Sequence, residues 1–152
     1  MLGCPGANQA PKQPSLTWLG TFGGDDSVAY DVSADGSMVV GVAYDTNGNQ
    51  RAFHWTAGKM EDLGTLGGDE SSAHDVSADG SVVVGKSNGR AFRWTFKGGM
   101  EDLNKTYAHL LTDGSELRAA YAISPNGRYI VGHGYNAATK RLEAFLLDTG
   151  RL

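Results

Sequence analysis

The sequence is poor in cysteine and in long apolar runs. Its 152 residues include one cysteine, Cys4, so the chain can form neither an intrachain disulfide nor a zinc site of paired thiolates. No apolar run approaches the ~18 residues of a membrane-spanning helix, so we expect no transmembrane segment. The 13 Lys and Arg residues are outnumbered by 17 Asp and Glu. The resulting net charge of −4 argues against a nucleic-acid partner, which requires a basic surface.

Proline is scarce beyond the first 15 residues, which hold three of the four prolines and no periodic pattern. We interpret residues 1–15 as an extended leader. Leu2-Gly3-Cys4 and the polar stretch after it are similar to the end of a bacterial lipoprotein signal, where lipid is attached to the cysteine. The charged start and apolar core of such a signal are absent. Cys4 is therefore a candidate for lipidation, and the alternative is a free cysteine on an extended end.

Glycine, by contrast, is abundant, and most of the 22 glycines fall at matching points of a repeat. GGDDSVAYDVSADGSMVVG begins at Gly23, and GGDESSAHDVSADGSVVVG begins at Gly67. A looser copy, AAYAISPNGRYIVG, begins at Ala119. The turn glycines of the first two copies are 44 residues apart. A period in the 40s indicates a repeat architecture.

Each repeat contains four short segments, rich in β-branched or aromatic residues and bounded by Gly, Asn or Asp, as strands are. Asp-Gly or Asn-Gly stands between the second and third segments of each repeat, which is the strongest short-range hairpin signal. We assign a structural turn role to the six residues at these points: Asp35, Gly36, Asp79, Gly80, Asn126 and Gly127.

The next segment of each repeat, such as Met38-Val39-Val40, is apolar at every position. A strand of this kind must be covered on both faces. A small antiparallel sheet flanked on both sides by sheets of its own kind is a β-propeller blade. We therefore predict an all-β, propeller-type domain over residues 16–152, with three four-stranded repeats at about 16–59, 60–99 and 100–152. A two-sheet sandwich and a β-solenoid are the alternatives.

The order of the segments predicts an open array. The chain begins on Leu16-Thr17-Trp18-Leu19, which matches Met60-Glu61-Asp62-Leu63 at the end of a meander, and the last repeat lacks this strand. Closed propellers have about four to eight blades. One hypothesis is a homodimer that closes a six-bladed ring by exchanging residues 16–19; a nine-bladed trimer is disfavoured. The other is a chain whose missing blades lie upstream.

The text RAFHWTAGKMEDLGTLGGDESSAHDVSADGSVVVG, with Arg-Ala-Phe at positions 51–53 and again at 90–92, resembles the bacterial HAF repeat family. The resemblance covers residues 16 to about 147. It implies a propeller-like protein with no assigned chemistry, either secreted or at the cell surface; lipidation of Cys4 would anchor such a protein to a membrane.

Recurring aromatic residues provide candidate binding residues. Trp55 and Trp94 share a repeat position with Leu147, which favours a core role. Tyr44 and Tyr135, near the turn after the apolar run, are the expected exposed pair. We predict that these two tyrosines bind ligand, either a glycan or a protein.

Catalytic signals are weak. HExxH, GxSxG, CxxC and P-loop patterns are missing. His54 shares a repeat position with Arg93, and His74 shares one with Tyr30 and Tyr121, an exchange typical of packing or surface residues. We predict no catalytic residue, no cofactor and no bound metal.

Two acidic pairs, Asp25-Asp26 and Asp69-Glu70, recur after Gly-Gly. Turn capping is their simplest role; glycoside cleavage and calcium binding are the alternatives. The sequence thus favours a non-catalytic binding or structural module outside the cytoplasm. The alternative is a carbohydrate-active enzyme, a glycosidase or lyase, with acidic residues at the ring mouth. Such an enzyme needs facing carboxylates with perturbed pKa values in a deep pocket.

Overall fold

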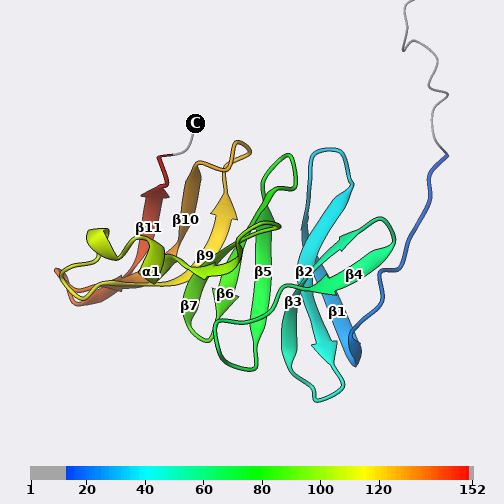
Figure 1. The fold of residues 1–152 in the computed structure, drawn as a ribbon, viewed down its shortest axis with the longest axis horizontal. Coiled ribbons are helices and arrows are strands. Elements are labelled where there is room, and N and C mark those ends of the chain that lie inside the picture. Colours follow the sequence, from blue (N-terminus) through cyan, green and yellow to red (C-terminus); the bar gives the residue numbers. More distant parts are fainter. Residues whose placement is uncertain (1–12, 151–152) are drawn as a thin grey trace, which may run out of the picture.

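The computed structural model describes residues 13–150, which form three antiparallel sheets. The first sheet has the order β1-β2-β3-β4, the second β5-β6-β7-β8 and the third β9-β10-β11 (Figure 1). The strands of the first sheet are β1 (Gly23–Val32), β2 (Met38–Asp45), β3 (Gln50–Thr56) and β4 (Lys59–Asp62). Those of the second are β5 (Ser71–Val76), β6 (Val82–Ser87), β7 (Arg90–Thr95) and β8 (Gly99–Asp102). Those of the third are β9 (Glu116–Ile123), β10 (Tyr129–Asn136) and β11 (Arg141–Asp148). The predicted all-β class is confirmed.

The glycine that ends each apolar run allows the first three strands of a sheet to pack closely. Gly85 lies between Ala73 of β5 and Phe92 of β7. A Cβ atom at Gly85 would overlap the backbone carbonyl oxygen of Ser72 and contact the Phe92 ring. The same arrangement occurs at Gly41 under Phe53 and at Gly132 under Phe145. The repeated glycine and phenylalanine of the sequence are therefore two halves of one packing contact.

The sheets pack face to face, and the apolar run of the middle sheet is buried on both sides: Val82 is 7% exposed, and Val83 and Val84 are 0% exposed. Between the first and second sheets lies a cluster that includes Met38, Val40, Val83, Phe92 and Trp94. Between the second and third sheets lies a cluster with Val84, Leu103, Ala120, Ile130 and Leu147 as members. Burial of each such large side chain stabilises the fold by roughly 1.5–3 kcal/mol. Each sheet is thus held chiefly by its neighbours.

The third repeat diverges where the chain passes from the second sheet to the third. Here lie α1 (Leu103–Thr106) and a short 3-10 turn, Ala108–Leu110. The Asp102 carboxylate caps α1 by accepting the backbone N–H of Asn104 at 2.9 Å, as carboxylates at helix N-termini do. This insertion replaces the Gly-Gly-Asp connection of the other two repeats.

One predicted strand is absent: residues 16–19 form no strand. The third sheet has three strands, as expected of a last repeat that lacks the fourth. A strand needs a hydrogen-bonded neighbour, and residues 16–19 lie beside the first sheet without pairing to an edge of it. Leu16 and Trp18 are 76% and 86% exposed there.

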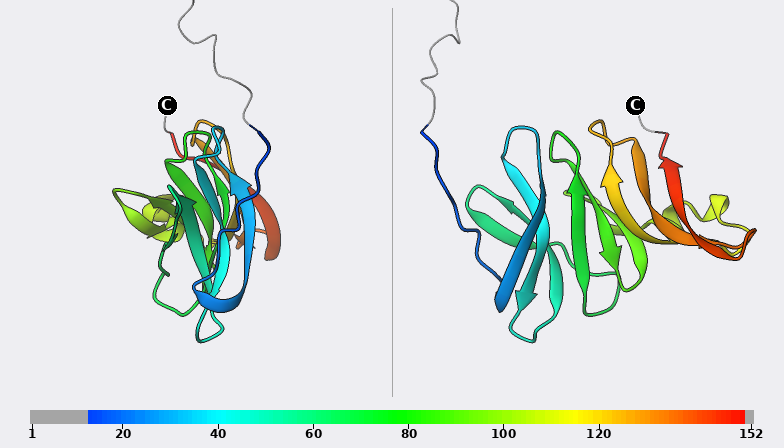
Figure 2. Two further views of the ribbon diagram at one scale, coloured as in Figure 1. Left: turned by 90° about the vertical axis from the view of Figure 1, so that its right-hand side faces the viewer. Right: turned by 180° about the vertical axis from the view of Figure 1, so that it is seen from behind.

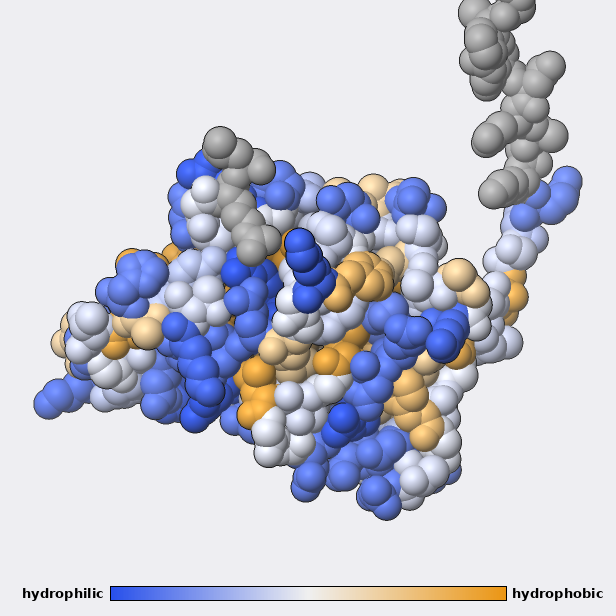
Figure 3. All heavy atoms as spheres, in the orientation of Figure 1, coloured by the Kyte–Doolittle hydropathy of each residue, from blue (hydrophilic) through white to orange (hydrophobic). Residues whose placement is uncertain are grey.

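The three sheets are arranged side by side in an open row, with β1 and β11 toward opposite ends (Figures 1 and 2). On the face that Figure 3 shows, hydrophobic side chains reach the surface in separate strips with hydrophilic residues between them. No helix within residues 13–150 is long and apolar enough to cross a membrane.

Candidate functional site

The first strands of the three sheets, β1, β5 and β9, bring one repeat position together. Tyr30, His74 and Tyr121 occupy this position, and we call them the first-strand aromatic row. The Tyr121 ring stacks on His74 with centroids 5.1 Å apart and an interplanar angle of 20°. The Tyr30 ring meets His74 edge to face at 5.9 Å. Tyr30 and Tyr121 are 53% and 50% exposed, so the row presents aromatic surface to solvent.

His74 is fixed in the middle of the row by the next sheet. Its Nδ1 lies 2.9 Å from the carbonyl oxygen of Ala120. Because a carbonyl can only accept, Nδ1 carries the proton and the neutral ring leaves Nε2 as an acceptor. Burial lowers the pKa of His74 below its usual value, although the Ala120 carbonyl acts in the opposite direction. The imidazole is therefore neutral at pH 7.

The residue after each aromatic position links one sheet to the next. An Asp31 carboxylate oxygen accepts the backbone N–H of Val76 at 2.9 Å. An Asp75 carboxylate oxygen accepts the backbone N–H of Ile123 at 2.6 Å. Ala122 occupies the position in the third sheet, so this ladder of carboxylates ends there. The two aspartates therefore have an architectural role.

The Asp31 and Asp75 carboxyl groups also interact with each other. Burial, followed by this contact with Asp31, raises the pKa of Asp75 to about 6. Burial acts in the same direction on Asp31, but hydrogen bonds from Asp75 and from the Val76 backbone hold its pKa below the usual value. One proton is thus shared, with Asp75 as its main holder below about pH 6.

The six predicted turn residues form the hairpin turns between the first and second strands of each sheet. Asp79 shows the pattern: its carboxylate accepts the Ser81 backbone N–H at 2.9 Å and the Ser81 and Ser77 hydroxyls at 2.6 and 2.8 Å. Asp35 and Asn126 accept equivalent bonds. The glycines at these turns adopt positive φ, which glycine does without steric cost: Gly36 at 76°, Gly80 at 77° and Gly127 at 77°.

Neighbouring turns are also joined through the backbone. The N–H of Ala34 donates to the carbonyl of Ala78 at 2.9 Å, and the N–H of Ala78 donates to the carbonyl of Pro125 at 3.0 Å. The turns and the carboxylate ladder thus connect the same edges of the three sheets. The SADG motif serves architecture by bracing each turn and linking it to the next.

Tyr44 and Tyr135 are not brought together, and neither is fully exposed. They lie near the ends of β2 and β10, on the first and third sheets, with the second sheet between them. Both are half-buried, because the Tyr44 hydroxyl accepts a 2.7 Å bond from Gln50 and the Tyr135 ring lies under the Arg118 guanidinium, 5.7 Å away. The expectation that they form an exposed pair is wrong, and their role in ligand binding stays a prediction. Cys4 lies outside the described residues.

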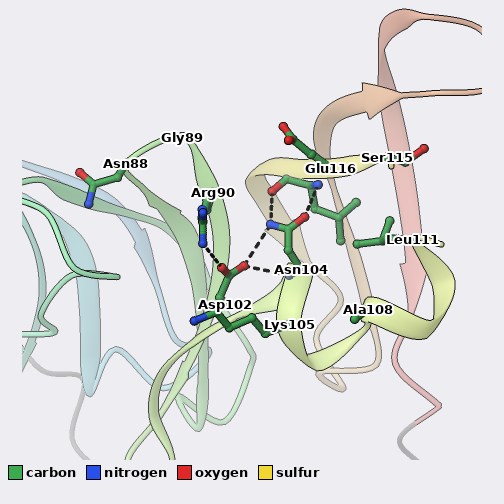
Figure 4. A pocket seen from close by; sticks show the side chains of 11 residues that line it. Asn88, Gly89, Arg90, Asp102, Asn104, Lys105, Ala108, Leu111, Ser115 and Glu116 are labelled. Carbon is green, nitrogen blue, oxygen red and sulfur yellow. Dashed lines mark hydrogen bonds and ion pairs between the residues drawn. The ribbon is translucent and has the colours of Figure 1, made fainter. Parts of the chain in front are cut away.

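A polar cavity of about 410 Å³ opens beside α1, between the second and third sheets (Figure 4). In its wall Arg90 bonds the Asp102 carboxylate at 3.0 Å. The Asn104 amide accepts the Leu117 N–H at 2.7 Å and donates to the Leu117 carbonyl at 2.8 Å. These groups satisfy one another, so they hold α1 against β9 before any ligand enters.

A larger groove, about 720 Å³, lies between residues 16–19 and the first sheet. Trp55, Val32 and Val39 are among its lining residues. The corresponding side chains of the second sheet, Trp94, Val76 and Val83, are buried against the first sheet. The groove is therefore an uncovered inter-sheet face.

Acidic and histidine side chains do not gather into a metal centre. Within residues 13–150, no group of three or more His, Cys, Asp or Glu side chains could hold a metal ion. His54 illustrates the packing role expected for histidines: it is 2% exposed and lies against Trp94 with ring centroids 5.0 Å apart. Its Nε2 is 3.2 Å from Glu61.

The fold class is that of a β-propeller. The structure is similar to that of TolB from Acinetobacter baumannii, a β-propeller protein, with a TM-score of 0.55 and 19% sequence identity. The similarity covers 86% of this chain and 31% of TolB, so the chain spans about a third of the length of that protein. The predicted propeller-type array of blades is confirmed, and each sheet is called a blade from here on. No protein-family model and no curated protein matches the sequence.

Proposed function

We propose that this protein is a non-catalytic module that binds carbohydrate on its first-strand aromatic row and works outside the cytoplasm. The observation that carries the proposal is the contiguous, half-exposed surface of Tyr30, His74 and Tyr121. Flat aromatic faces suit the apolar C–H face of a sugar ring. The free Nε2 of neutral His74 and the adjacent Asp31 supply hydrogen-bond acceptors for sugar hydroxyls.

The carboxylates beside the row favour binding over cleavage. Glycosidases hold two carboxyl groups about 5–5.5 Å apart when one of them attacks the sugar, or about 6.5–9.5 Å apart when a water molecule must also fit. Asp31 and Asp75 lie close enough for their carboxyl groups to interact directly, which does not suit a sugar placed between them. Each also accepts a backbone N–H from the next blade. A glycosidase or lyase mechanism is therefore the less favoured alternative.

The proposed location rests on the sequence. The resemblance to the HAF repeat family covers the three blades, and Cys4 lies in a leader similar to a lipid-attachment sequence. Neither secretion nor lipid attachment at Cys4 is needed for the binding surface itself. Fractionation of cells that produce the tagged protein, followed by mass spectrometry of its N-terminal peptide, tests both points. Recovery from the cytoplasmic fraction would contradict this part of the proposal.

Binding and turnover can be measured with the same reagents. Isothermal titration calorimetry against a panel of soluble neutral oligosaccharides, with β- and α-linked glucose, N-acetylglucosamine and mannose chains, should identify a binder. Reducing ends and unsaturated products should stay constant over hours at the same concentrations. Catalytic release of product, abolished by Asp75→Asn, would overturn the non-catalytic proposal; absence of binding across the panel would overturn carbohydrate as the ligand.

Two tyrosine variants locate the binding surface. Tyr121→Ala removes half of the stacked pair, and we expect at least a tenfold loss of affinity, which is about 1.4 kcal/mol. Tyr44→Ala, at the residue favoured by the sequence, serves as the matched control and should bind like the parent. Thermal unfolding verifies that both variants remain folded. If Tyr44→Ala weakens binding and Tyr121→Ala does not, the site lies near the end of β2.

A further inference from the structure

The outer face of the third blade is built like an interface but is uncovered. In the first two blades, the residue directly after Arg-Ala-Phe is buried against the next blade: His54 is 2% and Arg93 3% exposed. Leu146 occupies this position in the third blade and is 69% exposed. Val131, equivalent to the fully buried Val40 and Val84, is 42% exposed. Nothing within residues 13–150 covers these apolar side chains, although their equivalents in the other blades are buried.

The opposite face of the first blade is uncovered in the same way. Val32 is 51% exposed, whereas its equivalents Val76 and Ile123 are 5% and 7% exposed. Trp55 is half-buried in the groove, whereas Trp94 is 8% exposed. The first blade therefore has an uncovered face of the kind that packs against a preceding blade. The third blade has an uncovered face of the kind that packs against a following blade.

The third blade also lacks the strand that residues 16–19 match. In the first two blades, the outer strands β4 and β8 pair with β3 and β7, whereas β11 has a free edge. Transfer of the β4 register to β11 places Thr17 opposite Leu146, as Glu61 lies opposite His54. The equivalent pair of the second blade is Glu101 and Arg93.

The connection after residues 16–19 already has the geometry of a connection that follows an outer strand. The Thr21 hydroxyl donates to the Gly24 carbonyl at 2.9 Å, and the Ser27 hydroxyl donates to the Gly20 carbonyl at 2.6 Å. After β4, the equivalent Thr65 and Ser71 hydroxyls make the same two bonds at 2.7 and 2.6 Å. The chain thus enters the first blade through the same connection that follows β4 on the way into the second.

We infer that two copies of this chain close one six-bladed ring, each lending residues 16–19 as the fourth strand of the other's third blade. This inference stands independently of the proposed carbohydrate site. Three blades are below, and six within, the range of about four to eight in closed propellers. Because each chain carries both complementary faces, a two-fold pair buries both ends, whereas one chain leaves both open.

The junction between the copies differs from the junctions within a chain. The third blade has Ala122 where Asp31 and Asp75 accept, and Pro125, which has no N–H, where Ala34 and Ala78 donate. Neither inter-blade link can therefore cross to the partner's first blade. Two other contacts replace these links at the junction between the copies. Leu146, at the position of His54 and Arg93, supplies apolar burial, and the exchanged strand supplies backbone pairing.

Mass measurement tests the ring. Multi-angle light scattering at 20–50 μM should give twice the chain mass of 16.0 kDa. Leu146→Arg introduces the residue that the second blade tolerates at this position, so the blade should fold while the pair dissociates at least tenfold more readily. Leu110→Arg, at a 57% exposed leucine on the 3-10 turn, is the matched control and should remain paired. A parent protein that is monomeric, trimeric or polymeric would overturn the inference.

Cross-linking tests the register. In a Cys4→Ser background, Thr17→Cys combined with Leu146→Cys should form an interchain disulfide on mild oxidation, because directly opposed residues have Cβ atoms about 4.5–5.5 Å apart. Thr17→Cys with Leu142→Cys, four residues away along β11, should not. Equal cross-linking of both pairs, or of neither in a protein of dimer mass, would show that residues 16–19 do not complete the third blade.

Discussion

The Asp75 carboxylate accepts the backbone N–H of Ile123 across the junction between the second and third blades, at 2.6 Å. Asp31 makes the equivalent bond to Val76 one junction earlier. The aspartate on the first strand of these two blades thus belongs to one blade and accepts a hydrogen bond from the backbone of the next. The sequence repeat therefore specifies the contacts between blades as well as the strands within each blade.

Asp75→Ala should destabilise the fold by about 1–3 kcal/mol, because the Ile123 N–H is left without its acceptor inside a packed junction. Asp75→Asn keeps an acceptor oxygen and should cost less. Asp26→Ala, an exposed aspartate at the start of β1, is the control, with a change within ~0.5 kcal/mol. Urea unfolding measures all three. An Asp75→Ala protein as stable as the parent would mean that the ladder contributes nothing.

Asp75 should also make stability depend on pH. Its folded-state pKa is raised from 3.8 to about 6, so the folded protein binds this proton more tightly than the unfolded chain. The stabilisation is complete below about pH 3.8 and is lost as the pH rises through about 6. Asp75→Asn cannot ionise, so its melting temperature minus that of the parent should increase by a few degrees from pH 4 to pH 7. His74 titrates in both proteins and cancels in the difference. A constant difference would contradict the shared-proton account.

Arg93→Ala should destabilise the fold by about 2 kcal/mol or more. The buried Arg93 guanidinium donates to Glu101 at 2.6 Å and to the Tyr107 hydroxyl at 3.0 Å, and truncation removes packing as well as charge. Arg118→Ala breaks an exposed ion pair with Glu116 and should change stability by at most ~1 kcal/mol. Chemical denaturation compares them. Similar small effects would indicate that the Arg93 pair is as weak as a surface pair.

Gly85→Ala should be more damaging than any of these, at ~3 kcal/mol or more, because the new Cβ overlaps the Ser72 carbonyl and the Phe92 ring. Gly58→Ala, at a turn glycine with φ of 81° and open space around it, should cost only about 1–2 kcal/mol of backbone strain. Thermal unfolding of the two proteins should differ accordingly. Equal losses would mean that the strands of the second sheet can shift around a new Cβ atom at little cost.

The fold could largely be predicted from the sequence because its signals are local. Asp79 and Gly80 specify a turn through their own hydrogen bonds and positive φ, and Val82–Ser87 is a strand in any context that covers both faces. The status of residues 16–19 could not be predicted from local signals, because a fourth strand exists only beside an available edge. β11 lies at the edge of its sheet, and the sequence around residues 16–19 does not show whether they reach such an edge.

The candidate site was harder to predict from the sequence than the fold. The exchange of tyrosine and histidine among Tyr30, His74 and Tyr121 indicated packing or surface residues and no ligand site, whereas the structure places the three rings in contact. Equivalent residues on the first strands of adjacent blades become neighbours, and this rule could have identified the row once a propeller was predicted. The pairing of Asp31 with Asp75 follows from the same rule. Tyr44 and Tyr135 were chosen for expected exposure, which Gln50 and Arg118 reduce.

The proposed function is tested most directly by the position of a bound oligosaccharide. Backbone amide chemical shifts can be recorded while the oligosaccharide identified by calorimetry is titrated into the labelled protein. The largest changes should lie on β1, β5 and β9, centred on Tyr30, His74 and Tyr121, with the sugar chemically unchanged. Largest changes at Tyr44 and Tyr135 or in the cavity beside α1, or conversion of the sugar during the titration, would contradict the account.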